Sequence, residues 1–294
     1  MSCPICKSID CSSISKVNSI SKINPDDFKI TESDYGRTGP LFICNLCTFK
    51  FVVFPITTQN FYSKMVDYEY EEGASYRSLQ QRRIVDKLLK FKKKSDCLTL
   101  LDVGAGTGLL LKEAKSLNIE AIGLEPSKWA CEMGTKKGLK LINGVLPNIE
   151  LKNKTFDIIT LVDVIEHVEN PVGLLQLCNQ QLKANGILLV NTPDSKSFFA
   201  LIFGYKWWHY RIAHIGYFSK KTLKLAFDKS GFKILDLKRP TWYFELGYLY
   251  ARIRKYIGCL PSFENSNSKF LGYVFRIKIP LNLKDSLEVI VCKK

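Results

Sequence analysis

The pattern of apolar and polar positions changes character near residue 97. Beyond that point, short apolar runs alternate with segments whose apolar residues recur at helical spacing. The runs predict buried strands at residues 98–103, 119–124, 156–162 and 187–191. The helical spacing predicts helices at 109–117, 127–138, 171–183 and 220–229. Because strands and helices alternate, the pattern predicts βαβ units and a parallel sheet covered by helices on both faces.

The first 96 residues follow a different pattern. Residues 1–57 carry two paired-cysteine motifs, the second of which lies between strand-like apolar runs. An acidic and aromatic segment follows at 68–72, and then a helix-like stretch at 77–94 that ends in lysines. We therefore expect a zinc-ribbon-like domain at 1–57, a linking helical segment at 58–96 and one large domain at 97–294.

Four of the ten cysteines form the pairs Cys3-x-x-Cys6 and Cys44-x-x-Cys47, with 37 residues between them. Two such knuckles supply four thiolates, which is the ligand set of a closed, structural Zn²⁺ site. The glycine that often follows a knuckle is replaced by Lys7 and Thr48. Cys11 is an alternative fifth candidate ligand. We predict structural zinc here, against the alternative of two chance pairs.

Composition places the chain among ordinary globular proteins, with 46% hydrophobic and 24% charged residues over 294 positions. No apolar run approaches the roughly 20 residues of a membrane-spanning helix, and the N-terminus lacks the pattern of a secretory signal. We therefore expect a cytoplasmic protein with reduced thiols.

The net charge is +15, and residues 201–260 hold 12 basic and 3 acidic side chains. Such a field attracts phosphates of nucleic acid, anionic lipid or a nucleotide-linked substrate, and the alternative is a solubilising background. The basic, aromatic stretch 242–256 is a candidate for peripheral contact with an anionic membrane surface.

Candidate chemistry begins where the first strand of the large domain ends. Gly104, Gly106 and Gly108 follow Asp102 and precede a helix, which is the first strand–turn–helix of a doubly wound sheet. Glu125 ends the next strand, 21 residues after Gly104, where a carboxylate can accept both hydroxyls of a ribose. The turn and the acid together predict a nucleoside-containing cofactor, against the alternative of a glycine turn without a ligand.

These stretches, with 156–171 and 186–194, resemble class I S-adenosylmethionine (SAM)-dependent methyltransferases of the small-molecule and sugar group. The resemblance covers about residues 97–235. It implies an α/β, Rossmann-like doubly wound sheet of seven strands whose last strand, at 287–293, is antiparallel. It also implies SAM as cofactor, bound by Asp102, Gly104, Ala105, Gly106, Glu125, Pro126, Gly144, Val145, Leu161 and Asp163. The acidic residue that the family often has near Gly144 is missing, so the backbone of Gly144 and Val145 is expected to meet the adenine.

Aromatic residues crowd the segment after the last parallel strand, with 17 of the 35 between positions 198 and 256. We expect them to form a packed substrate cap at about 197–285. In the family segment that resembles residues 207–219, a histidine faces the transferred methyl group. His214 is therefore the predicted general base and His167 a second catalytic candidate, and the alternative for each is a structural role.

The sequence leaves three functions open. The first is methylation of a sugar hydroxyl, on a nucleotide-linked or lipid-linked acceptor of surface glycan biosynthesis. The second is methylation of RNA, using the zinc ribbon and the positive charge. The third is a non-catalytic, zinc-containing binding module that retains the cofactor fold.

Overall fold

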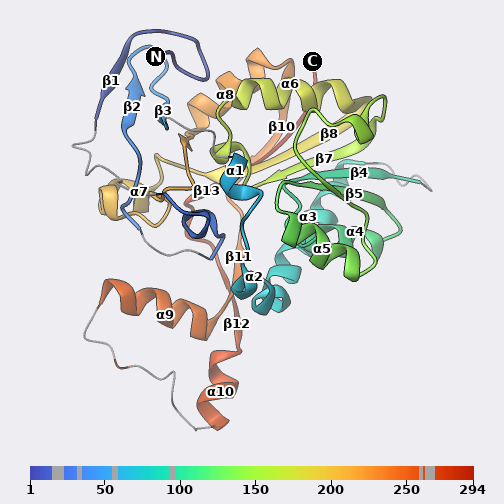
Figure 1. The fold of residues 1–294 in the computed structure, drawn as a ribbon, viewed down its shortest axis with the longest axis vertical. Coiled ribbons are helices and arrows are strands. Elements are labelled where there is room, and N and C mark those ends of the chain that lie inside the picture. Colours follow the sequence, from blue (N-terminus) through green and yellow to red (C-terminus); the bar gives the residue numbers. More distant parts are fainter. Residues whose placement is uncertain (15–22, 32–34, 55–58, 93–96, 258–260, 262–268) are drawn as a thin grey trace.

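The computed structural model describes residues 1–14, 23–31, 35–54, 59–92, 97–257, 261 and 269–294. A seven-stranded sheet forms its centre, in the order β10-β13-β8-β7-β4-β5-β6 (Figure 1). The adjacent strands β8, β7, β4, β5 and β6 run parallel to one another, and β13 pairs antiparallel with both of its neighbours, β10 and β8. This confirms the predicted α/β fold with an antiparallel last strand. The strands are β4 (Thr99–Val103), β5 (Glu120–Glu125), β6 (Leu141–Asn143), β7 (Phe156–Val162), β8 (Leu182–Pro193), β10 (Phe232–Lys238) and β13 (Ser286–Lys293).

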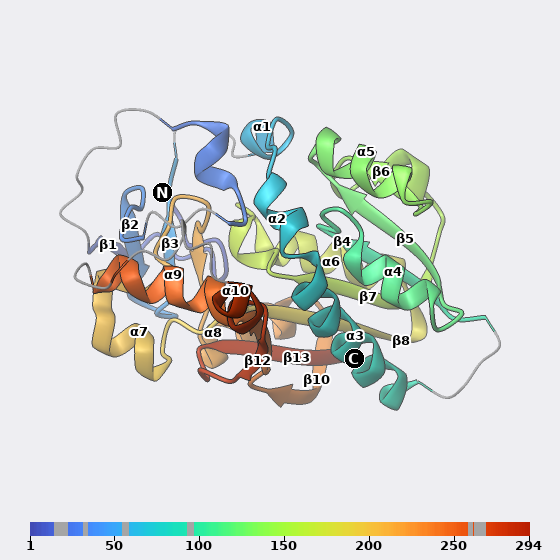
Figure 2. The ribbon, with the colours of Figure 1, turned by 90° about the horizontal axis from the view of Figure 1, so that it is seen from below.

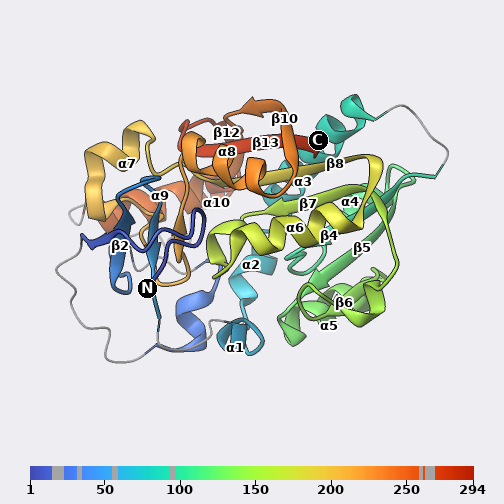
Figure 3. The same ribbon diagram turned by 90° about the horizontal axis from the view of Figure 1, so that it is seen from above.

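Helices cover both faces of this sheet, as Figures 2 and 3 show. The face covered by α3 (Ala74–Phe91) and α4 (Leu109–Lys115) receives Leu100 from β4. The opposite face, covered by α6 (Pro171–Gln181) and α8 (Lys220–Lys229), receives Leu101. Successive side chains of a strand point to opposite faces, so a continuous apolar run is what a sheet buried on both sides requires.

The predicted elements are present, with shifted ends. The helix predicted at 127–138 is α5 (Lys128–Lys136), and Ser127 caps it by accepting a hydrogen bond from Ala130 N. The helix predicted at 77–94 is α3, and residues 93 and 94 lie outside the described part of the chain. The helix predicted at 171–183 ends at Gln181. Leu182 already pairs with Phe156 in the sheet and is buried, so packing against the core decides where this helix ends.

A smaller sheet combines residues from distant parts of the chain. It consists of β1 (Cys11–Ser13), β2 (Leu41–Cys44), β3 (Lys50–Val52) and β9 (Gly216–Tyr217), in that order. Its last strand, β9, comes from the segment that precedes α8. The residues of the predicted zinc-ribbon domain therefore share a sheet with residues of the predicted methyltransferase domain.

The segment predicted as a cap divides into two parts. Its α8 and β10 complete the layers of the central sheet. A hairpin of β11 (Trp242–Glu245) and β12 (Lys278–Leu281) extends away from it, with α9 (Leu246–Tyr256) and α10 (Lys269–Phe275), at the bottom of Figure 1. Among the described residues, no helix has both the length and the apolar character needed to cross a bilayer.

The remaining short elements are helices α1 (Gln59–Tyr62), α2 (Tyr68–Glu72) and α7 (Phe198–Phe203), with single turns of 3-10 helix at η1 (Pro25–Phe28), η2 (Ile149–Leu151), η3 (Ile165–His167) and η4 (Gly204–Lys206).

A buried carboxylate ties α3 to the sheet. Glu288 of β13 is 1% exposed and accepts hydrogen bonds from Arg83 at 2.6 and 3.1 Å and from Lys87 at 3.0 Å. Lys87 also pairs with Asp236 of β10 at 2.8 Å. Burial alone would raise the pKa of Glu288, but the two cations bring it below its usual value. The carboxylate is therefore charged and compensated at neutral pH.

Replacing Glu288 by glutamine is expected to lower the free energy of unfolding by about 3 kcal/mol, because two partly buried cations lose their compensating charge. Urea unfolding followed by circular dichroism measures this change. Glu120→Gln is the matched control, since its pair with Lys140 is mostly solvent-exposed and is expected to contribute little. Equal midpoints for the two variants would contradict the assignment.

Candidate active site

A cavity of about 870 Å³ lies at the carboxyl ends of the parallel strands. The turns after β4, β5 and β7 all open into it, because the carboxyl ends of parallel strands meet at one edge of a sheet. The predicted site residues that line it are Asp102, Gly104, Ala105, Gly106, Glu125, Pro126, Gly144, Val145, Asp163, His167 and His214. The structure thus brings all but one of the predicted cofactor and catalytic residues together.

The exception is Leu161, which does not line the cavity. It is fully buried in β7, among the core residues beneath α6 and α8. The side chain that reaches the cavity from the end of this strand is that of Val162. Because side chains alternate between the two faces of a strand, a shift of one position moves a residue from the ligand side to the core.

The glycine turn has the backbone that its sequence predicts. Gly104, Gly106 and Gly108 have φ angles of 76°, 54° and 82°, a region that residues with a Cβ rarely adopt. A Cβ on Gly104 would lie 2.4 Å from the Cγ2 atom of Val164. The turns after β4 and β7 therefore approach each other closely, and the backbone of residues 104–106 is exposed to the cavity.

Glu125 is fixed between two backbone amides. Gly106 N donates to its Oε2 at 2.9 Å, and Ser127 N donates to its Oε1 at 2.8 Å. The side chain is 5% exposed, and burial raises the pKa of its carboxyl, although the two amide hydrogen bonds oppose that shift. Each carboxylate oxygen has more than one acceptor position, so a fixed Glu125 can still accept hydroxyl groups from a ligand in the cavity.

Two aspartates in the cavity are also held in unusual environments. Asp102 accepts a hydrogen bond from Thr160 Oγ1 at 2.6 Å, and burial raises its pKa to about 7. Asp163 has a φ of 53° and a side chain that is exposed to the cavity, and desolvation by the surrounding protein raises its pKa to about 6. A positive charge placed in the cavity would stabilise the ionised form of both.

The turn after β6 contributes its backbone. Gly144 N donates to the carbonyl oxygen of Glu125 at 2.9 Å, which joins the ends of β5 and β6. The Gly144 amide is therefore used within the fold. The sequence predicted that the backbone of Gly144 and Val145 meets the adenine. This hydrogen bond occupies the Gly144 amide and does not involve Val145, which also lines the cavity.

The two predicted catalytic histidines are in contact. The ring centroids of His167 and His214 lie 4.7 Å apart in an edge-to-face arrangement. His167 Nδ1 lies 2.8 Å from the carbonyl oxygen of Ala213 and 2.5 Å from the hydroxyl of Tyr62. Because a carbonyl oxygen only accepts, we assign the proton of neutral His167 to Nδ1, which leaves the lone pair on Nε2. Burial lowers the pKa of His167 to about 4 and holds that of His214 well below its usual value, so both rings are neutral near pH 7.

Glu166 completes this cluster and was not among the predicted residues. It is 1% exposed and accepts a hydrogen bond from Thr192 at 3.0 Å through Oε2, and its Oε1 has no hydrogen-bond partner among the residues that the structure describes. Burial raises the pKa of its carboxyl well above the usual value. Its position beside His167, directly after a buried strand, was the available sequence signal.

The ligand atoms of Glu166, His167 and His214 all lie within 4.8 Å of one another. Two imidazole nitrogens and one carboxylate oxygen at this separation can hold a divalent cation, and each group can also accept a proton by itself.

Several other cavity residues were not among the predicted site residues. Tyr62 and Tyr70 extend over the cavity from α1 and α2, and the Arg77 guanidinium of α3 lies 4.6 Å from the Tyr70 ring centroid. His209 Nε2 lies 3.4 Å from Asp285 Oδ2, which also accepts from Trp208 Nε1 at 3.0 Å. Tyr62, Tyr70 and Arg77 lie 27 to 42 positions before Gly104, whereas His209 and Asp285 lie more than 100 positions after it. A local sequence pattern therefore could not show that they share one cavity.

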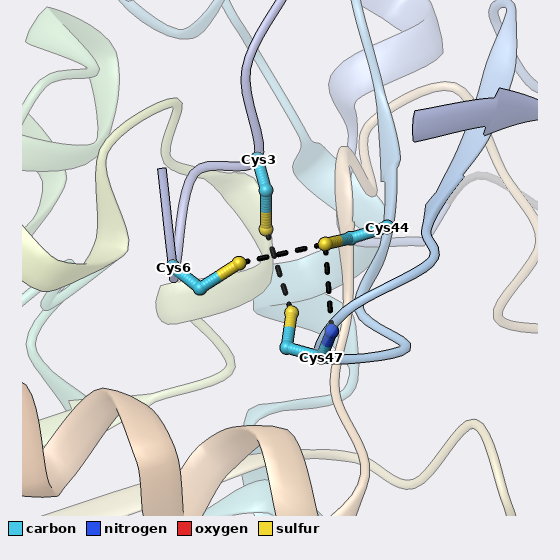
Figure 4. Close-up of side chains that lie close together, drawn as sticks. All are labelled: Cys3, Cys6, Cys44 and Cys47. Atoms are coloured by element: carbon cyan, nitrogen blue, oxygen red, sulfur yellow. Dashed lines mark hydrogen bonds between the residues drawn. The ribbon is translucent and has the colours of Figure 1, made fainter. Parts of the chain in front are cut away.

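The four predicted zinc ligands form a second cluster, away from the cavity lining (Figure 4). The Sγ atoms of Cys3 and Cys47 lie 3.5 Å apart, those of Cys6 and Cys44 lie 3.4 Å apart, and all four lie within 4.8 Å. A tetrahedron with Zn–S bonds of about 2.3 Å requires sulfur separations of roughly 3.8 Å. The cluster fits a zinc ion with little adjustment.

The two knuckles share the same backbone geometry. Lys7 and Thr48 have φ angles of 64° and 68°, and their amides donate to the carbonyls of Cys3 and Cys44. Lys7 and Thr48 stand where a glycine often follows a cysteine knuckle. Both residues adopt the left-handed backbone conformation although they are not glycines. Cys11 Sγ instead points to the carbonyl of Ser8 at 3.6 Å.

Comparison with known proteins gives several partial matches. The chain is 26% identical over 137 residues to the mitochondrial ubiquinone biosynthesis O-methyltransferase of Schizosaccharomyces pombe, covering 42% of this chain and 50% of the relative. It is 32% identical over 117 residues to the ubiquinone biosynthesis O-methyltransferase of Photobacterium profundum, covering 36% and 48%. The matches thus span about half the length of these curated relatives.

The fold is similar to that of a crystallised SAM-dependent methyltransferase from Archaeoglobus fulgidus, with a TM-score of 0.50 and 22% identity over 78% of this chain and all of that one. This likeness concerns the fold alone.

Residues 74–237, more than half of the chain, match a family model described as a methyltransferase domain. The match confirms the methyltransferase prediction and supports SAM as the cofactor. It begins at the first residue of α3, so the predicted linking segment contributes to the matched region. The chain belongs to the methyltransferase domain family.

Proposed function

We propose that this protein transfers the methyl group of SAM to an oxygen atom of a small-molecule acceptor. The observation that carries the proposal is the placement of the Glu125 carboxylate and the Glu166–His167–His214 cluster in one cavity. The first suits a ribose, and the second suits a hydroxyl group that must lose a proton. The curated relatives are named O-methyltransferases, which supports oxygen as the methylated atom.

The residues of the cavity fit the cofactor. Glu125 would bind the ribose hydroxyls, the backbone of Gly104 to Gly106 would lie along the amino-acid part, and Val145 would face the adenine. When bound, SAM supplies a methyl group on a positively charged sulfur, which is already activated for transfer. Asp102 and Asp163 are carboxyls whose ionisation a nearby cation favours, and this matches the charge of the sulfonium.

The protein has two tasks in such a transfer. It must align the acceptor oxygen with the methyl carbon, and it must receive the proton of the hydroxyl. Neutral His214 offers a ring nitrogen for that proton, with Glu166 and His167 beside it. The oxygen then forms the bond to the methyl carbon as the carbon–sulfur bond breaks. We assign His214 as the base and His167 as the residue that positions it.

The acceptor is expected to carry a ring. Aromatic side chains line the cavity, among them Trp208, Phe244 and Tyr248. A sugar or an aromatic ring could pack against them. The relatives are named for ubiquinone biosynthesis, so a glycan acceptor and the RNA alternative draw no support from them and stay sequence-based predictions.

We further propose that Cys3, Cys6, Cys44 and Cys47 hold a structural zinc ion. The closed set of four ligands has no open position for a substrate. Cys3, Cys44 and Cys47 are buried in the same core cluster as Phe218 and Leu223, so this ion would stabilise the packing of the N-terminal segment on the central domain.

Replacing Glu125 by glutamine is expected to weaken binding of S-adenosylhomocysteine by roughly 10–100-fold, because the side-chain amide must point a donor at the N–H of Gly106 or Ser127. Isothermal titration calorimetry measures the affinity. Glu132→Gln, on the exposed face of α5, is the control and should bind as the parent does. Unchanged binding by the Glu125 variant would refute the assigned cofactor site.

His214→Ala is expected to lower turnover by at least about 100-fold while leaving the affinity for S-adenosylhomocysteine unchanged. Turnover is measured with radiolabelled SAM and a panel of phenols, nucleotide sugars and RNA. His209→Ala is expected to raise KM more than it lowers kcat, since His209 pairs with Asp285 and lies outside the Glu166 cluster.

Turnover in the presence of EDTA or added MnCl₂ shows whether the cluster of Glu166, His167 and His214 holds a divalent cation or accepts a proton. Loss with the chelator and recovery with Mn²⁺ would assign it to a cation. Retained turnover in the His214 variant would remove that residue as the base.

Cys44→Ser is expected to abolish zinc binding, whereas the parent should contain one zinc ion per chain by inductively coupled plasma mass spectrometry. Cys11→Ser is the matched control and should retain the metal, because the Cys11 thiol points to the Ser8 carbonyl. The Cys44 variant is also expected to have a lower Tm, since metal binding contributes to folding. A parent without zinc after purification in zinc-containing medium would contradict the site.

A further inference from the structure

Helix α7 has an unusual surface for a helix of a globular protein. Phe198, Leu201 and Ile202 are 68%, 65% and 61% exposed. Phe203 and the following Tyr205 are also exposed. A single exposed apolar residue needs no explanation, but several on one short helix form a patch that soluble proteins rarely leave uncovered. We call these five residues the α7 patch.

The helix that carries this patch is firmly held. Ser197 caps it by accepting a hydrogen bond from Ala200 N, and Ala200 is buried against Trp207 and Tyr210. The side chains of the patch therefore project from a fixed base. Trp207, Tyr210 and Tyr217 of the predicted cap are packed together, whereas the side chains of the α7 patch are left at the surface.

The segment that carries the patch is basic. Residues 195–227 contain six Lys or Arg and no Asp or Glu, and Asp194 and Asp228 bound this window. Lys196 precedes α7 and Lys206 follows it, and both side chains are exposed. Apolar side chains flanked by lysines are typical of segments that lie in the interface of a membrane, where the apolar part enters the acyl region and the lysines meet anionic head groups.

The patch is continuous with the wall of the cavity. The ring of Phe203 lies 6.0 Å from that of Trp208, and Phe199 of the same helix lies 5.5 Å from it. Trp208 lines the cavity. A surface that seats α7 would therefore lie next to the acceptor side of the site.

We propose that the α7 patch, with Lys196 and Lys206, docks the protein onto the surface of a membrane that contains anionic lipids. The apolar side chains supply the buried area, and the lysines supply the preference for negative charge. This surface differs from the basic stretch 242–256 that the sequence suggested. Docking does not depend on methyl transfer, so it can hold or fail independently of the proposed function.

Co-sedimentation with vesicles of equal parts phosphatidylcholine and phosphatidylglycerol tests the proposal. The parent is expected to bind these vesicles, to bind pure phosphatidylcholine much more weakly, and to lose affinity as salt is raised. The variant F198S/L201S/I202S is expected to bind at least tenfold more weakly. Ile149→Ser is the control, because Ile149 is 79% exposed in η2, beyond β6, which Figures 2 and 3 place on the opposite side from α7.

A charge-matched pair of variants tests the lysines. K196E/K206E is expected to reduce binding to the anionic vesicles, whereas K152E/K154E makes the same change in net charge at exposed positions next to η2 and should have a smaller effect. Calorimetry with S-adenosylhomocysteine on every variant confirms that the cavity is intact. A failure of docking is thereby distinguished from a failure to fold or to bind the cofactor.

Three results would overturn the proposal. The first is a parent that does not bind anionic vesicles at low salt. The second is a triple serine variant that binds as the parent does. The third is a parent that is dimeric by light scattering and becomes monomeric in the triple variant, which would assign the patch to a second copy of the chain.

Discussion

The hydrogen bonds between β3 and the segment that leads into β9 position the acceptor side of the site. Lys50 pairs with Tyr217, Phe51 pairs with Gly216, and Val52 N donates to the carbonyl of Ile215 at 2.8 Å. Ile215 N in turn donates to the carbonyl of Glu166 at 2.9 Å. The backbone next to His214 is thus held between the N-terminal sheet and the turn after β7. The cysteine knuckles at one end of β3 and the histidine cluster near its other end belong to one hydrogen-bonded framework.

The two halves of the cavity differ in how the sequence encodes them. The cofactor half is built from strand–turn–helix units, in which residues a few positions apart determine the geometry. Hence the sequence could predict the glycine turn, Asp102 and Glu125. It could also predict the central strands and that they run parallel to one another. The acceptor half brings Tyr62, Glu166, His214 and Asp285 together from four distant segments. Periodicity carries no information on such contacts, and for the same reason the pairing of β9 with β3 was not foreseen.

Two other differences between the sequence-based predictions and the structure concern residues in elements that were themselves predicted correctly. Leu161 was placed on the ligand side of β7 and lies on the core side, because alternation makes a strand sensitive to a single position. Residues 58–96 were predicted to be a linking helical segment. In the structure α3 is held to β13 through Glu288, and Tyr62 of α1 and Tyr70 of α2 line the cavity. A local reading of helical spacing predicts α3 but does not show what it packs against.

The distribution of charge connects the interior of the molecule with its surface. The chain carries a net charge of +15, yet Asp102, Asp163 and Glu166 are carboxyls of the cavity whose pKa values burial raises. Arg77 and Arg211 also line the cavity and oppose the shift of Asp163, and Arg211 opposes that of Glu166, so these acids are partly matched by cations. A further positive charge in the cavity would favour the ionised carboxyls. The electrostatic preference of the cavity is therefore opposite in sign to what the net charge of the chain alone would predict.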